Sequence, residues 1–458
     1  MGKSVRKENI KKANNYIVQF KGTVNNEYRQ HYHMMPPIGW LNDPNGLVYF
    51  TGRYHLYYQF NPYASRPGQM CWGHFVSEDL IDYFDDGVAL KPDIENASAY
   101  SGGAIEHHGN IHAFYTLHVE NGDEKTEEVY KAVSESGFSF GKGIKVFDNE
   151  YLPENISRTD FRDPCPMKIG DMYYVLVGGK DINLNAGVIV VLSGRSTERL
   201  HYAFTIGPFY ELGNMGECPS WFRIGDKDVL VVSGCAVPQR DNDFKNVNSS
   251  VFIVGEIDFK NGSMKVDYIK EIDKGDAFYA PQFIRGADSP IMIGWLEMWE
   301  RKYFTSENNH GWVGAFSIPR EISIKDGDIF QTPVHTLDEH LHDTEEDEVP
   351  RCADMRFTFK GDGKLTIEGE NGSVSIIKDG EISVDTTESN NLNGCVRKTN
   401  KRYDKCEIRV LLDVSSIEVF IDGGREVISS RIYIDGDYTI TKSGDISDLT
   451  IKEIGKKR

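Results

Sequence analysis

The sequence predicts an all-β protein in which a five-bladed β-propeller is followed by a C-terminal β-sandwich. From about residue 30 to 335, short aromatic and β-branched runs, such as 54–60 and 188–192, alternate with Gly, Asn and Asp. No long helical pattern interrupts these runs. A weak repeat of about 60 residues divides the region. From about residue 350 to 455, alternating strand patterns resume.

Residues 1–27 are predicted to form a helical lead-in, because Ile10, Ala13, Tyr16 and Ile17 recur at helical spacing. The segment lacks the apolar core of a signal peptide, and no stretch approaches the roughly 20 apolar residues of a membrane span. The seven cysteines are scattered without a C-x-x-C pair, which favours reduced thiols. We therefore expect a cytoplasmic protein with no membrane partner.

The propeller is predicted over residues 28–335. The segments 77–83, 134–140 and 196–202 each begin with Ser, contain an acid and end in an aromatic residue, and their starts are 57 and 62 residues apart. A unit of this length suits one four-stranded blade, so the region holds about five. Since the innermost strand of every blade lines one central channel, acids far apart in the sequence can meet there.

The propeller pattern ends near Pro333. Residues 336–349 are acidic and polar and are predicted to form a linker, and 350–458 are predicted to form the β-sandwich. A chain of 458 residues usually divides into two domains. Its net charge of −19 argues against a nucleic-acid partner, because phosphate neutralisation needs basic patches. The oligomeric state is not fixed by these patterns.

Three acids stand in turns rich in Gly and Pro. Asp43 lies between two amides in residues 40–46 (W-L-N-D-P-N-G), Asp163 follows Arg162 in F-R-D-P, and Glu217 lies in G-E-C-P. Taken singly, each favours an ordinary structural interpretation: an Asx turn for Asp43, a structural salt bridge for Asp163 and a strand end for Glu217. Together with flanking amides and aromatic rings, they have the character of a sugar-binding site.

Seven motifs connect the chain to a known family: W-L-N-D-P-N-G, Q-F-N-P, W-G-H-F-V-S-E-D-L, Y-S-G-G, F-R-D-P, G-E-C-P and F-Y-A-P-Q, in this order. On these motifs the chain resembles the β-fructosidases of glycoside hydrolase family 32, over about residues 28–333 and again over 409–434. The resemblance implies a five-bladed propeller, in agreement with the repeat. It also implies a retaining β-fructofuranosidase, whose partner is sucrose, sucrose 6-phosphate or a short fructo-oligosaccharide.

The resemblance implies a role for each acid. Asp43 would be the nucleophile, Glu217 the general acid/base, and Asp163 the residue that holds fructose hydroxyls and stabilises the transition state. We expect the neighbouring amides to favour the anion of Asp43. Desolvation and nearby carboxylates should raise the pKa of Glu217. The substrate-binding residues implied are Trp40, Asn42, Gln59, Tyr100, Ser101, Arg162, Tyr279 and Trp295, of which Tyr279 and Trp295 are equally well explained as blade packing.

Three departures from the family pattern concern the leaving group. Gly103 replaces a usual Ser, Ala277 stands where an Asp is common, and the loop Ala64–Cys71 lacks the Trp often found before W-G-H. Neither a metal nor another cofactor is expected, because the pair His31 and His33 lacks a third ligand at suitable spacing. Two alternatives remain: a fructosyltransferase that uses the same site, and a non-catalytic sugar-binding propeller.

Overall fold

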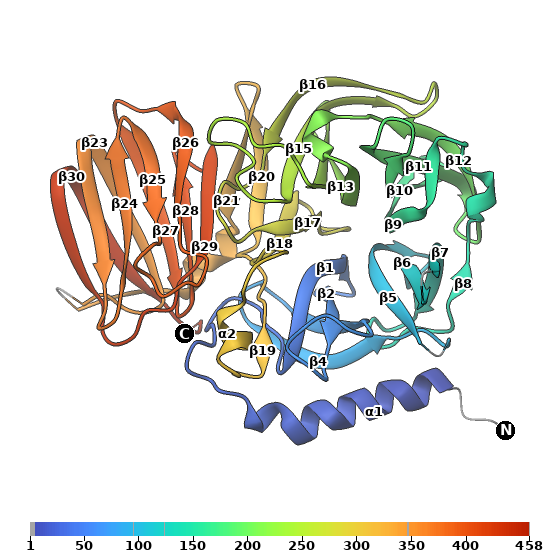
Figure 1. The fold of residues 1–458 in the computed structure, drawn as a ribbon, viewed down its shortest axis with the longest axis horizontal. Helices are drawn as coiled ribbons and strands as arrows, with labels where there is room; N and C mark the ends of the chain where they lie inside the picture. Colours follow the sequence, from blue (N-terminus) through green and yellow to red (C-terminus); the bar gives the residue numbers. More distant parts are fainter. Residues whose placement is uncertain (1–4, 95, 123, 346–347, 458) are drawn as a thin grey trace.

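The computed structural model describes residues 5–94, 96–122, 124–345 and 348–457. Figure 1 shows a ring of β-sheets beside a separate stack of strands, with helix α1 (Val5–Phe20) packed under the first blade. The predicted all-β class, with a five-bladed propeller and a sandwich-like C-terminal unit, is confirmed. Within the described ranges, no helix is long and apolar enough to cross a membrane.

Five antiparallel sheets form the blades, and each takes its strands in sequence order. Their bounds are as follows: blade 1, β1 (Gly39–Phe50), β2 (Arg53–Asn61), β3 (Cys71–Ser77) and β4 (Tyr83–Leu90); blade 2, β5 (Ala97–His107), β6 (Asn110–Asn121), β7 (Glu124–Ser134) and β8 (Ile144–Lys145); blade 3, β9 (Ile156–Ile169), β10 (Met172–Asp181), β11 (Ala186–Ser196) and β12 (Arg199–Ile206); blade 4, β13 (Met215–Ile224), β14 (Lys227–Cys235), β15 (Ser249–Asp258) and β16 (Ser263–Glu271); blade 5, β17 (Tyr279–Phe283), β18 (Ile291–Trp295), β20 (Arg320–Lys325) and β21 (Asp328–Pro333).

The ring closes through a short strand, β19 (Trp312–Val313), which lies between β18 and β20 in the sequence. It pairs in parallel with β1, opposite Gly39 and Trp40, and so ties the last blade to the first. Short helical turns complete the unit: η1 (Lys21–Thr23), η2 (Asn149–Tyr151), η3 (Tyr210–Leu212) and α2 (Phe304–Glu307).

The sequence repeat marks the same position in three blades, the end of the third strand. Ser77, Ser134 and Ser196 are the last residues of β3, β7 and β11, so each repeated segment begins where the third strand of a blade ends. The first strands β1, β5, β9, β13 and β17 contact one another around the centre of the ring (Figure 1). Side chains from the beginning of each first strand can therefore share one site.

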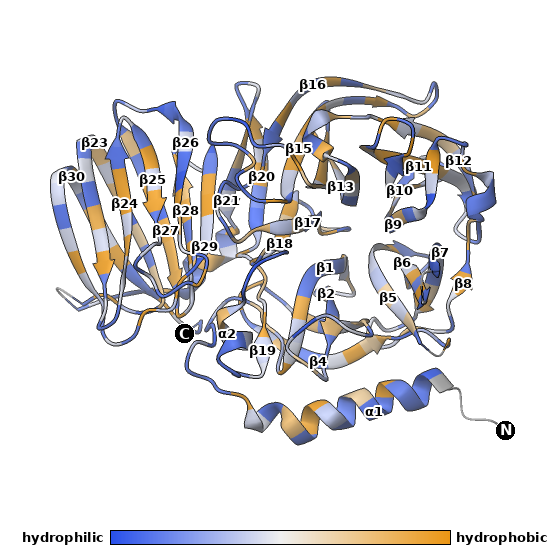
Figure 2. Cartoon of the chain, in the orientation of Figure 1, coloured by the Kyte–Doolittle hydropathy of each residue, from blue (hydrophilic) through white to orange (hydrophobic). Residues whose placement is uncertain are grey.

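The apolar runs are continuous because both faces of a blade are covered. In β11, Val188, Val190 and Leu192 join the core between blades 2 and 3, whereas Ile189 and Val191 join the core between blades 3 and 4. Alternate side chains of a strand point to opposite faces. Figure 2 shows the resulting apolar strands inside the ring. Each blade is thus packed between two others, which fixes the positions of the first strands.

The C-terminal unit is organised around the long strand β23 (Ala353–Glu368), which β30 (Thr439–Ile454) follows along one edge. The first half of its other edge pairs with β27 (Cys406–Asp413), and the second half pairs with β24 (Ser373–Asp379). The two layers share one apolar core. The remaining elements are η4 (His335–His340), β22 (Leu341–Asp343), β25 (Glu381–Asp385), β26 (Val396–Arg402), β28 (Ser416–Ile421) and β29 (Glu426–Arg431).

A buried ionic network joins the two units. His33 of the propeller lies 2.9 Å from Asp413 and 2.9 Å from Glu418 of the sandwich, through different ring nitrogens. Arg320 of blade 5 also contacts Glu418, and it contacts Asp273 of the propeller. Buried charges of this kind require close partners, so the network fixes how the units dock.

Candidate active site

The three predicted acids meet in one cavity. Asp43 and Glu217 lie near the starts of β1 and β13, and Asp163 lies midway along β9; these are the first strands of blades 1, 4 and 3. They line a cavity of about 410 Å³. The predicted binding residues that also line it are Asn42, Gln59, Tyr100, Ser101 and Arg162. The structure therefore brings these residues together, and their catalytic roles remain predictions.

Asp43 is almost fully buried. The hydroxyl of Ser101 donates a hydrogen bond of 2.6 Å to Asp43 Oδ2. The other oxygen, Oδ1, is buried without a hydrogen bond of normal geometry to any residue that the structure describes. Buried carboxylate oxygens are normally paired, so this oxygen has hydrogen-bonding capacity that the described residues do not fill.

The balance of effects at Asp43 differs from the sequence expectation. Burial raises the pKa of Asp43, and the hydrogen bonds from Ser101 and Asn42 lower it without cancelling the effect of burial. The flanking amide acts in the expected direction, but desolvation is the stronger influence.

Asp163 occupies an unusual backbone conformation. Its φ is 65°, and Cys218, which follows Glu217, has φ 46°. The amide of Cys218 donates a hydrogen bond of 2.9 Å to Asp163 Oδ2, and the amide of Asp163 donates one of 2.8 Å to Thr116 Oγ1. Left-handed conformations are rare for residues other than glycine and cluster at functional sites. Here they place Asp163 in the cavity beside Glu217.

Glu217 is held by two donors. Arg162 donates from Nη2 at 2.5 Å and from Nε at 3.1 Å to Oε1, and the hydroxyl of Tyr279 donates at 2.6 Å to Oε2. Burial raises the pKa of Glu217, but the charge of Arg162 and these hydrogen bonds outweigh it, and the net shift is downward. The expected upward shift is therefore wrong for the free site.

The pKa values of the other two acids are shifted in the opposite direction to that of Glu217. Burial, together with the charges of Glu217 and Asp43, raises the pKa of Asp163 in spite of Arg162. Since interacting carboxyl groups titrate as a set, the arrangement provides one ionised acid and neighbours that hold protons more tightly.

Two predicted contact residues lie behind the cavity wall. Trp40 and Trp295 are fully buried, their ring centroids are 5.7 Å apart, and neither is among the lining residues. Trp295 thus has the packing position, and Trp40 Nε1 orients Asn42 by a 2.6 Å hydrogen bond to Oδ1. Tyr279, also buried, reaches Glu217 with its hydroxyl. The indole that lines the cavity is Trp299, which stacks near Trp40 with centroids 5.8 Å apart.

Sequence reasoning missed one wall of the cavity. His118 on β6 and Lys125 and Glu127 on β7 line it, and the ring of His118 stacks on Tyr100 with centroids 4.0 Å apart. These residues lie in ordinary strand patterns without Gly or Pro. Their strand periodicity gave no indication of the cavity.

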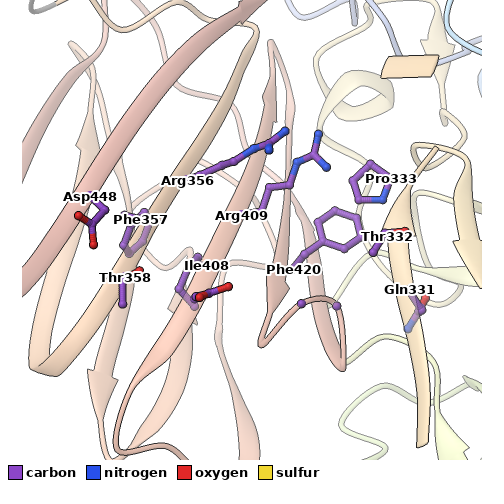
Figure 3. A pocket seen from close by; sticks show the side chains of 13 residues that line it. Gln331, Thr332, Pro333, Arg356, Phe357, Thr358, Ile408, Arg409, Phe420 and Asp448 are labelled. Carbon is purple, nitrogen blue, oxygen red and sulfur yellow. The ribbon is translucent and has the colours of Figure 1, made fainter. Parts of the chain in front are cut away.

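A second cavity, of about 240 Å³, lies between blade 5 and the sandwich (Figure 3). Pro333, Phe420 and Phe357 contribute apolar walls, and Arg356 and Arg409 extend beside them. Both arginines are ion-paired with Asp354. The three acids are absent from its lining residues, so the site is assigned to the cavity at the propeller centre.

Glycoside hydrolases use paired carboxyl groups in different protonation states, and the carboxyl groups at the centre of this propeller have opposite pKa shifts. Residues 33–333 match the family model "Glycosyl hydrolases family 32 N-terminal domain", and residues 359–453 match "Glycosyl hydrolases family 32 C terminal". The chain therefore belongs to glycosyl hydrolase family 32, and it is a hydrolase that acts on β-fructosides.

Individual relatives agree with this assignment. A sucrose-6-phosphate hydrolase of Escherichia coli is 30% identical, with 92% of each chain covered. The structure of a variant β-fructofuranosidase of Bombyx mori in complex with sucrose has a TM-score of 0.86 and 30% identity, with 98% of each chain covered. A sucrose-6-phosphate hydrolase of Lactobacillus gasseri, 24% identical over 96% of each chain, shares the fold with a TM-score of 0.87.

Proposed function

We propose that this protein is a retaining β-fructofuranosidase. It would hydrolyse the terminal β-D-fructosyl bond of sucrose, sucrose 6-phosphate or a short fructo-oligosaccharide. The observation that carries the proposal is the meeting of Asp43, Asp163 and Glu217 in one cavity, with the buried Oδ1 of Asp43 unpaired. Retaining glycosidases need two carboxyl groups about 5–5.5 Å apart, one to attack the sugar and one to protonate the leaving oxygen.

In this mechanism Asp43 attacks the anomeric carbon with Oδ1, while Ser101 holds Oδ2. Glu217 transfers a proton to the leaving oxygen and later takes a proton from the attacking water. Asp163 accepts hydrogen bonds from fructose hydroxyls and stabilises the positive charge that develops on the ring. Each of the three acids thus has a different task.

Substrate entry must supply the protonated form of Glu217. The sugar displaces water from the cavity, and further desolvation raises the pKa of a carboxyl group. A proton held by Asp163 or Asp43 in the free site can then reside on Glu217. This step makes the ionic surroundings of Glu217 part of the mechanism.

The proposal is tested with Glu217→Gln, which keeps the shape of the side chain but cannot donate the acid proton. Activity on sucrose should fall by at least about 10²-fold, with a smaller loss for an activated fructoside in its first step. Glu211→Gln is the matched control, because Glu211 pairs with Arg240 at 3.3 Å and does not line the cavity. Equal losses on both substrates would contradict the general-acid role.

Retention of the anomeric configuration is tested by a separate measurement. Attack by Asp43 followed by attack of water inverts the anomeric centre twice. Proton NMR of the first-formed fructose should therefore show the β-anomer, and an α first product would exclude the covalent intermediate. The seven cysteines are all free thiols, which supports the further proposal of a cytoplasmic location.

A further inference from the structure

Glu127 is a buried carboxylate on the third strand of blade 2. Its side chain is 1% exposed. The other carboxyl groups of the cavity come from the first strands of blades 1, 3 and 4, so Glu127 reaches the site from farther out in the ring. Burying a charge is unfavourable unless partners compensate it, and the charged and ring partners of Glu127, namely Arg162, Lys125 and His118, line this cavity.

Four groups surround the carboxylate of Glu127. Arg162 Nη1 lies 3.1 Å from Oε2, and Lys125 Nζ lies 3.0 Å from Oε1. The amide of Phe161 donates to Oε2 at 3.2 Å, and His118 Nδ1 is 3.5 Å from Oε1. Burial raises the pKa of Glu127, but His118, Arg162 and Lys125 lower it to about 2. Glu127 therefore stays ionised across the working pH range.

Arg162 connects this carboxylate to the reacting one. Its guanidinium donates from Nη1 to Glu127 and from Nε and Nη2 to Glu217. A guanidinium is a rigid planar fork, so fixing one corner orients the other two nitrogens. One positive charge is thus shared between two carboxylates, of which only Glu217 reaches the centre of the site.

We propose that Glu127 is a positioning residue for the reaction: it holds the fork of Arg162 against Glu217 and offsets part of its positive charge. This inference rests on the proposed acid–base role of Glu217. Without the charge of Glu127, the full charge of Arg162 would act on Glu217, which would then hold its proton less tightly. The acid would be ionised at the pH where it must donate.

Other charged and titratable groups act on the same carboxyls, from the same blades and from neighbouring ones. They are Asp43, Asp163, Tyr279, Cys218 and Cys235 around Glu217, and Lys125, His118 and Asp160 around Glu127 and Arg162. Among these, Lys125 is a second cation that pairs with Glu127, at 3.0 Å, and it also pairs with Asp160 at 3.2 Å. The positive charge of Lys125 therefore offsets part of the negative charge of Glu127. Removing Lys125 should shift the pKa of Glu217 in the opposite direction to removing Glu127.

The experiment is the pH dependence of kcat/KM for sucrose in Glu127→Gln. The basic limb, which reports loss of the acid proton, should move to lower pH by about one unit, with a smaller change for an activated fructoside. At neutral pH, kcat should fall about 10-fold, with KM changed much less. Glu127→Asp, which keeps the charge, should restore part of the shift.

Glu128→Gln is the matched control. It makes the same change one residue along β7, where Glu128 pairs with Lys145 at 2.7 Å away from the cavity lining, and it should keep the wild-type profile. Lys125→Met should move the basic limb to higher pH, and it tests the idea even if Glu127→Gln does not fold. A basic limb unchanged in every folded variant at Glu127 and Lys125 would overturn the inference.

Failure of the proposed function itself would look different. If Glu217→Gln keeps its activity on sucrose, the acid–base assignment is wrong and Glu127 has no acid to position. If Glu217→Gln loses activity as expected but the basic limb of the pH profile stays unchanged in the variants at Glu127 and Lys125, only the positioning role is wrong. Circular dichroism of each variant separates both outcomes from unfolding.

Discussion

Replacing His33 with glutamine should weaken the docking of the propeller against the sandwich. Nδ1 of His33 lies 2.9 Å from Asp413 and Nε2 lies 2.9 Å from Glu418, and all three side chains are 0% exposed. Ionised carboxylates only accept hydrogen bonds, so both ring nitrogens must donate and the ring carries a positive charge. A glutamine amide is neutral and cannot replace that charge.

The expected loss follows from the partners that remain. Removing one member of a buried ionic contact typically costs about 3–5 kcal/mol. Both carboxylates keep other donors: the amides of His31, Tyr32 and Val414 for Asp413, and Arg320 and the amide of Ile318 for Glu418. The loss should therefore lie at the lower end, about 3 kcal/mol in the free energy of unfolding.

The effect should depend on pH with a definite sign. Burial lowers the pKa of His33, but the hydrogen bonds and charges of Asp413 and Glu418 outweigh it and raise the pKa. A raised folded-state pKa gives stability that is complete below about pH 6.5 and is lost as pH rises through the folded value. The pKa of Asp413 is lowered to about 2, so its contribution persists above about pH 4 and is lost on further acidification.

Urea unfolding at pH 6 and pH 9, followed by tryptophan fluorescence, measures both quantities. His33→Gln should differ from wild type most at pH 6 and less at pH 9. His31→Gln is the matched control, because His31 lies two residues earlier with an exposed side chain and contacts Asp413 through its backbone. Two outcomes would refute this reasoning: equal free energies of unfolding for the two variants, or a loss of stability in His33→Gln that is the same at pH 6 and pH 9.

Three further predictions concern the site. Ser101→Ala removes the 2.6 Å hydrogen bond that lowers the pKa of Asp43, so the acidic limb of the kcat/KM profile should move to higher pH; an unmoved limb would contradict it. Activity should survive dialysis against EDTA, since the mechanism needs one acid protonated and another free, and a loss restored by Zn²⁺ or Ca²⁺ would argue otherwise. Chromatography should show free fructose as the first product from inulin, with slower cleavage per chain end than for sucrose, because the cavity of about 410 Å³ admits a chain end; a ladder of oligomers would exclude exo-action.

The residues that sequence reasoning placed correctly belong to local patterns. Asp43, Asp163 and Glu217 stand in short motifs with Gly or Pro, and each lies on the first strand of a blade. The repeat predicted the length of a blade because each copy begins at the last residue of a third strand, as at Ser77 and Ser134. Such features depend on neighbours in the sequence, which one chain displays without further information.

The rest depends on contacts between distant strands. Glu127 has the pattern of a strand residue with a polar face, and only the packing of blade 2 against blade 3 turns it toward Arg162. Trp40 and Trp295 have the composition of sugar-binding rings, yet blade packing buries both. Trp299, in no recognisable motif, lines the cavity instead. A side chain's exposure is decided by the neighbouring blade, which its own strand does not encode.

The pKa shifts of the acids also depend on contacts between distant strands, which the sequence does not display. At Glu217, the immediate neighbours in the sequence favour a raised pKa, but the groups that lower it are Arg162 and Tyr279, 55 and 62 residues away. A charge-assisted contact of 2.5 Å outweighs the general effect of burial, whereas Asp43 receives a neutral hydroxyl and burial prevails. The direction in which each acid is shifted therefore depends on where the one guanidinium points. Glu127 holds the same guanidinium, so this residue, which no motif marks, is the one through which we propose that the charge of Glu217 is adjusted.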